Sequence, residues 1–113
     1  MRENEKKALG LLGLAARAGR VTVGVPLCCE ALKKRANDKK STPVILLFAS
    51  DASLPTKKRI TDKAAYYGVP LVALSLDCAA LAVAVGKRGG SVAAVLVNEP
   101  NLARAIGALY EIQ

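Results

Sequence analysis

The feature that most constrains the fold is an apolar run at residues 43–49, with the sequence PVILLFA. An unbroken run of this length, rich in Val, Ile and Leu, is typical of a strand buried on both faces of a sheet. Such a strand needs a covering layer on each side. The run therefore predicts a sheet that lies between two layers of helices, with residues 44–48 as a central strand.

Strands and helices alternate after this run. Further strands are expected at residues 69–74 and 92–97, and each of the three strands precedes a helix. Short polar side chains satisfy the free N–H groups at a helix start, so three residues are predicted to be N-caps: Ser53, Asp77 and Asn98. Gly68 is the expected stop of the first of these helices. This alternation predicts an α/β sandwich with a largely parallel or mixed sheet.

The N-terminal part of the chain also alternates between predicted helices and a predicted strand. Residues 3–18 place Leu12 on the apolar face of a predicted helix, and residues 20–23 form a short predicted strand. Pro26 suits the first turn of a second helix, where its missing N–H is not needed. Leu27 is expected to face the core. The whole chain, residues 1–113, is interpreted as one domain.

Composition excludes several classes of protein. Hydrophobic residues make up 52% of the chain, which excludes an intrinsically disordered tail. The absence of histidine removes the usual acid–base group and the commonest metal ligand. Three cysteines without a C-x-x-C motif predict neither a zinc site nor a disulfide framework. With no signal peptide expected at the N-terminus, the chain is predicted to be cytoplasmic, without a membrane span.

Residues with catalytic potential have simpler interpretations. Asp51 and Asp77 follow strands, where active-site carboxylates occur in α/β folds, but each can instead cap a helix or its preceding turn. Cys28 and Cys29 lie near a helix start, which stabilises thiolates, but they are better explained as small core residues. Residues 86–91 lack P-loop spacing, so they are either a basic loop that contacts nucleic acid or a plain surface loop.

Positive charge is concentrated in one half of the chain. Residues 1–63 contain 14 Lys and Arg against six Asp and Glu, whereas residues 64–113 contain three of each. A single basic cluster is usually a solvated helix face. Taken together, the clusters favour binding to a polyanion, with contacts to phosphates instead of stacked bases, since few aromatic residues are interleaved with them. Of Tyr66 and Tyr67, at least one is expected in the core.

Several motifs resemble the bacterial YlxQ-type proteins, which belong to the ribosomal-protein superfamily of kink-turn RNA binders. The resemblance covers residues 3–112 and is carried by LLGLAARAGR at 11–20, Gly24, VILLFASDAS at 44–53, TKK at 56–58 and YYGVP at 66–70. It implies a three-layer α-β-α sandwich with a four-stranded mixed sheet, no enzymatic activity, and RNA as the ligand.

The resemblance also implies a binding site. It lies at the start of the second helix, in the turn after the long apolar strand, and in the loop before the last strand. Gly24 matches the glycine that lets the RNA backbone approach. With the basic clusters, the candidate RNA-binding residues are Gly24, Lys33, Lys34, Ser53, Lys57, Lys87 and Arg88.

Three positions depart from the family pattern. Where kink-turn readers have an Asn-Glu pair and then a lysine, this chain has Pro26, Leu27 and Glu30. The first two side chains cannot hydrogen-bond to base edges, and Glu30 repels phosphate.

The leading hypothesis is a non-catalytic protein that binds ribosomal or other structured RNA, with possible contacts to the ribosome or translation factors and no cofactor or metal. The alternative is a protein–protein adaptor whose basic face binds an acidic partner.

Overall fold

The computed structural model describes residues 3–87 and 89–111. Their elements, in chain order, are α1 (Glu3–Arg17), β1 (Val21–Val23), α2 (Val25–Asn37), β2 (Ile45–Phe48), α3 (Leu54–Tyr67), β3 (Leu71–Ala73), α4 (Cys78–Ala84), β4 (Ala94–Val97) and α5 (Pro100–Leu109). Every helix and strand expected from the sequence is present, although the strands are shorter than the apolar runs that contain them.

The four strands form one mixed sheet in the order β1-β4-β2-β3. The β2–β3 pair is parallel, whereas β4 runs antiparallel to both β1 and β2. Strand β2 therefore lies inside the sheet, which confirms the prediction of a central strand at residues 44–48.

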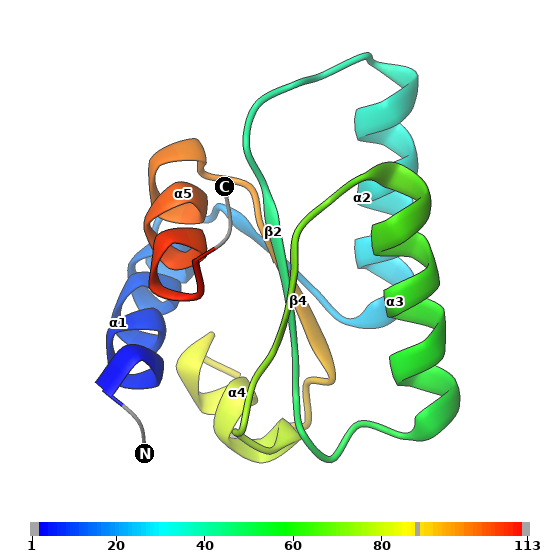
Figure 1. Cartoon of the computed structure of the whole chain (residues 1–113). Helices are drawn as coiled ribbons and strands as arrows, with labels where there is room; N and C mark the ends of the chain where they lie inside the picture. The colour runs from blue at the N-terminus through cyan, green and yellow to red at the C-terminus, as the bar shows by residue number, and fades with distance from the viewer. Residues whose placement is uncertain (1–2, 88, 112–113) are drawn as a thin grey trace.

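Helices cover both faces of the sheet. Helices α1, α4 and α5 lie on one face, and α2 and α3 lie on the other (Figure 1). This arrangement confirms the three-layer α-β-α sandwich.

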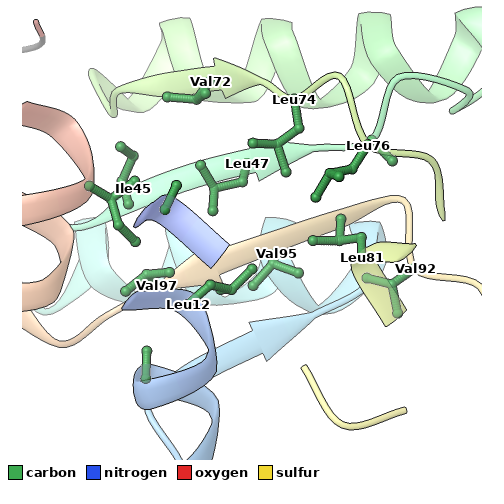
Figure 2. Close-up of a cluster of buried hydrophobic side chains, with 14 of the residues drawn as sticks. Leu12, Ile45, Leu47, Val72, Leu74, Leu76, Leu81, Val92, Val95 and Val97 are labelled. Atoms are coloured by element: carbon green, nitrogen blue, oxygen red, sulfur yellow. The ribbon is translucent and has the colours of Figure 1, made fainter. Parts of the chain in front are cut away.

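Successive side chains of β2 point into two different cores, because side chains alternate between the faces of a strand. Ile45 and Leu47 pack with Val95 and Val97 in the cluster next to α1, α4 and α5 (Figure 2). Leu46 belongs to a second cluster, which contains residues of α2 and α3. One short strand thus connects both halves of the hydrophobic core.

The helix ends follow the sequence signals with one exception. The side chains of Ser53 and Asp77 accept hydrogen bonds at the starts of α3 and α4, and Gly68 ends α3 with φ 66°. The N-cap of α5, however, is Glu99 and not Asn98. Asn98 continues the pairing of β1 with β4 instead: its N–H donates to Arg20 O, and its side-chain oxygen accepts from Arg20 Nε.

A buried carboxylate connects α1 to the turn after β3. Glu5 is only 4% exposed. Its Oε1 accepts the backbone N–H of Ser75 at 3.1 Å, and its Oε2 accepts the Ser75 hydroxyl at 2.6 Å. Both oxygens therefore have donors, which offsets the unfavourable free energy of burying a charged group.

We expect Glu5→Ala to lower the free energy of unfolding by about 1–3 kcal/mol, because the Ser75 N–H and hydroxyl lose their acceptor in a partly buried site. The measurement is urea denaturation. Glu3→Ala is the matched control, since Glu3 lies in the same first turn and is exposed. Equal stability of the two variants would contradict a structural role for Glu5.

Candidate nucleic-acid interface

One end of the sheet brings the segments implied by the family resemblance together. The N–H of Gly24 donates to Ala94 O, and the N–H of Ala49 donates to Ala93 O, each at 2.9 Å. The start of β4 therefore lies between the turn that enters α2 and the segment that leaves β2, with about 4.8 Å between neighbouring strands. The segment that enters β4 here is fixed by the Val92 N–H, which donates to Cys78 O at 3.1 Å, and Lys87 precedes this segment in the chain. We call this region, which includes Gly24, Ser53, Lys57 and Lys87, the Gly24 end.

Gly24 gives this end an open, adaptable backbone. Its φ of 94° and ψ of 146° lie in a region that residues with a Cβ rarely adopt. A Cβ added here would meet no other heavy atom within 4 Å. The backbone conformation, and not crowding, therefore requires glycine. The absence of a side chain also leaves space for a ligand to approach.

The start of α2 can attract an anion. Among the described residues no side chain caps this helix, and its first turn contains no acidic residue. The N–H of Leu27 in that turn has no carbonyl within the helix to bond to, as is general for a first turn. Unpaired N–H groups and the helix dipole together favour a negatively charged ligand.

Ser53 has a structural role at the start of α3. Its Oγ accepts the Thr56 N–H at 3.2 Å and lies 2.8 Å from the Thr56 hydroxyl. Lys57 follows in the first turn of the helix. This arrangement confirms Ser53 as an N-cap, and it places an exposed hydroxyl and a partly exposed lysine at the same helix end.

The loop before β4 holds Lys87 between two turns of the backbone. Gly86 and Gly89 have φ of 82° and 78°. The Lys87 N–H donates to Ala82 O at 2.8 Å, which fixes the start of the loop to the end of α4. Lys87 is exposed. Arg88, its predicted partner in RNA binding, lies outside the described residues.

Lys33 and Lys34 are exposed but lie elsewhere. They are nine and ten residues beyond Gly24, and a helix rises 1.5 Å per residue, so about 14 Å of α2 separates them from the Gly24 end. Lys34 lines a cavity with Arg20 and Asn98 instead. The structure therefore divides the predicted RNA-binding residues into two groups.

Across residues 3–87 and 89–111, the one ion pair is between Lys58 and Asp62, at 3.0 Å. Neither Lys57 nor Lys87 is in an ion pair with a described residue. Both remain available to phosphates.

The two aspartates after the strands cap helix α4. Asp77 accepts the Ala80 N–H at 2.7 Å, as expected. Asp51 accepts the Cys78 N–H at 2.7 Å, so it caps α4 and not the next helix in the chain, α3. Hydrogen bonds from the Cys78 side chain and N–H hold the pKa of Asp51 below its usual value, and the charge of Lys57 acts in the same direction. Sequence reasoning missed the Asp51–Cys78 contact, which joins residues 27 positions apart.

One prediction about the first turns of α2 is wrong. Leu27, expected in the core, is 55% exposed. Leu32 faces the core, whereas Pro26, Leu27 and Glu30 lie on the exposed side of the helix. All three departures from the kink-turn pattern are therefore exposed on the surface of α2.

The aromatic residues provide little surface for base stacking. Tyr67 packs against the core next to α2 and α3, as expected of one of the pair. Tyr66 is 80% exposed and meets Tyr67 edge to face.

Within the described parts of the chain, no group of His, Cys, Asp and Glu side chains could hold a metal ion. No described helix is long and apolar enough to cross a membrane.

The cysteines differ in exposure. Cys28 is buried, and its Sγ lies 3.4 Å from Thr22 O. Burial raises its pKa to about 12, and the neighbouring Cys29 acts in the same direction. Cys29 and Cys78 are partly exposed. The interpretation as a small core residue is thus confirmed for Cys28.

We expect a thiol-alkylating reagent at pH 8 to modify Cys29 and Cys78 much faster than Cys28, because Cys28 is buried and its raised pKa leaves little of the reactive thiolate. Peptide mass mapping after timed labelling measures this order. The unfolded chain in denaturant is the control, where all three should react alike. Rapid labelling of Cys28 in the folded chain would show that its surroundings open readily.

Proteins of known name are similar in sequence to this chain. No family model matches the chain. The RNA-binding protein YlxQ of Bacillus subtilis (strain 168) is 35% identical over 85 residues, which span 75% of this chain and 78% of that protein. The chain belongs to the YlxQ family.

A second YlxQ relative and one solved structure agree with this assignment. The RNA-binding protein YlxQ of Enterococcus faecium is 42% identical over 67 residues, which cover 59% of this chain and 59% of that protein. A solved structure of a protein with unknown function from Bacillus halodurans C is 30% identical, with a TM-score of 0.73, over 93% of this chain and 97% of that one. The names of the YlxQ relatives describe a binding role, in agreement with the prediction that the chain is not an enzyme.

Proposed function

We propose that this chain binds structured RNA, of the ribosomal or kink-turn type, through the Gly24 end. The observation that carries the proposal is the convergence there of the starts of α2 and α3 with the Lys87 loop. The strand pairing of β1, β4 and β2 holds these segments together. The names of the YlxQ relatives support RNA as the polyanion.

Each part of this end suits a different feature of an RNA backbone. The exposed start of α2 binds a phosphate through the Leu27 N–H and the helix dipole, and Gly24 leaves space for that phosphate to approach. Lys57 and Lys87 neutralise further phosphates from the neighbouring segments. Contacts of this kind read the shape of the RNA and not its base sequence.

The exposed face of α2 determines how far recognition extends to bases. Pro26, Leu27 and Glu30 occupy this face without offering a base-edge partner suited to paired purines. We infer that the chain contacts the RNA backbone there and discriminates a kinked RNA from a duplex less strongly than the family pattern implies.

Replacing Lys87 and Arg88 together by Ala tests the proposed face. We expect weaker binding to a kink-turn RNA and a log–log salt slope that is shallower by up to about two phosphate contacts, each of about 0.7–0.9. The measurement is fluorescence anisotropy across a series of salt concentrations.

The matched control is Lys40→Ala with Arg104→Ala. This variant also removes two positive charges, those of the exposed Lys40 and Arg104, which line the cavities at the far end of β2. It should melt at nearly the same temperature as the unmodified chain, because exposed charges contribute little to stability. Equal loss of RNA affinity in the two would show that only net charge matters, which contradicts the proposal.

A second experiment restores the family pattern through Pro26→Asn, Leu27→Glu and Glu30→Lys. We expect a gain in affinity for a kink-turn RNA over a duplex of equal length, since each good base-edge contact contributes about 1–3 kcal/mol by analogy with groove readout. The exposed position of Leu27 means that the introduced glutamate is not buried.

Glu30→Lys alone is the control, because it changes the charge without adding the Asn-Glu pair. It should raise affinity for both RNAs alike. A folded triple variant that gains nothing for the kinked RNA would show that these positions do not limit recognition.

A further inference from the structure

The end of the sheet opposite Gly24 contains two adjoining cavities. One, of about 520 Å³, lies between the start of β2, the turn before β3 and the middle of α5. The other, of about 300 Å³, lies between α2 and the strand ends near Arg20 and Asn98. Arg35 and Val44 line both, so together the cavities form one groove around the start of β2. We call this the Arg35 groove.

The larger cavity combines an aliphatic floor with cations at its sides. Val44, Ile45 and Val69 are among its lining residues, whereas Arg35 and Arg104 are its charged ones. The two arginines come from α2 and α5, which lie on opposite faces of the sheet (Figure 1). The groove therefore spans both helical layers.

The smaller cavity extends the positive charge. Its charged lining residues are Arg20, Lys34, Arg35, Lys40 and Asp38. Four cations against one carboxylate leave an excess of positive charge, which favours an anionic ligand. No ion pair of a described residue involves any of these side chains.

One donor of the Arg35 guanidinium, Nε, lacks an acceptor within the described part of the chain. Its Nη2 donates to Thr42 O at 2.8 Å, but its buried Nε has no hydrogen-bond partner among the described residues. Burying a charged donor without an acceptor is unfavourable. A carboxylate that enters the groove can supply one after a small rotation of the guanidinium, whose planar geometry matches a carboxylate.

The shape and chemistry of the groove distinguish between possible anionic ligands. A nucleic acid presents a phosphate at every nucleotide, and its bases prefer aromatic platforms, of which the lining residues include none. An extended peptide can place alternate side chains on an apolar floor and the others next to cations. A volume of about 520 Å³ is in the range of clefts that bind several side chains.

We propose that the Arg35 groove binds an extended segment of a partner protein in which acidic and aliphatic residues alternate. The acidic side chains pair with Arg35, Arg104 and the lysines, and the aliphatic side chains lie over Val44 and Val69. Because the groove is at the other end of β2 from Gly24, this site is separate from the proposed RNA site, and the two can be occupied together.

The test is an NMR titration of the isotope-labelled chain with a synthetic peptide of about seven residues in which Asp alternates with Val and Leu. Such a peptide spans about 23 Å when extended, close to the shortest dimension of the molecule, 25 Å. We expect amide shifts at Ile45, Val69 and Gly107 and unchanged signals at Gly24 and Lys87. A peptide with Asn in place of Asp should not bind.

Arg35→Glu with Arg104→Glu should weaken binding of the Asp peptide by at least about tenfold, since two charge-assisted contacts are replaced by repulsion. Lys7→Glu with Arg59→Glu is the matched control, because it changes the net charge equally at exposed positions outside the groove. If the double variant at the groove does not fold, the peptide affinity of Arg104→Glu alone is measured instead. Arg104 is exposed, so its replacement should not prevent folding.

Three results would overturn the proposal: no binding of the Asp peptide, equal weakening in the control, or peptide shifts at Gly24. A kink-turn RNA that shifts the groove signals while the peptide does not would identify the groove as a nucleic-acid site. Loss of RNA binding in the Lys87 and Arg88 variant, with peptide binding intact, would separate the two sites.

Discussion

Burial of β2 and β4 on both faces is the constraint on which the rest of the structure depends. Each strand contributes alternate side chains to two cores, so neither can be stable unless helices cover both sides. The chain therefore changes face twice, through β1 between α1 and α2 and through β3 between α3 and α4. The segments of the proposed RNA site lie at strand ends, where Gly24 and the segment before β4 meet the end of β2. The core thus positions the proposed RNA site without contributing a side chain to it.

The sequence predicted the elements that depend on local chemistry. The apolar run at 43–49 identified the central strand, and Ser53, Asp77 and Gly68 marked helix ends because capping needs only nearby residues. Asn98 and Leu27 were predicted wrongly for a shared reason. Both side chains fit the local pattern, but tertiary pairing with Arg20 occupies Asn98, and the rotation of α2 against the sheet leaves Leu27 exposed.

The contacts that the sequence did not predict join distant parts of the chain. Glu5 and Ser75 are 70 positions apart, and Asp51 and Cys78 are 27 apart. No periodicity or capping motif links such pairs, because each depends on how two segments meet after the sheet has formed. The candidate site shows the same limit: the family resemblance indicated Gly24 and the loops, whereas the charge count indicated only that a basic face exists. Sequence could not show that Lys34 lines a cavity with Arg20 and Asn98.

The cations lie at two ends of the sheet, so the net charge alone does not indicate which ligand each group of cations binds. A net charge of +8 attracts any polyanion at long range, and this attraction does not distinguish RNA from an acidic protein. Discrimination must come from what surrounds each group of cations. At the Gly24 end they stand beside a helix start that no described side chain caps and a glycine turn, which suit phosphates. In the Arg35 groove they stand beside Val44, Ile45 and Val69, and a phosphate backbone has no apolar group to place there. The two proposed sites therefore differ in chemistry although both are basic, because β2 holds its two ends, with their different neighbours, apart.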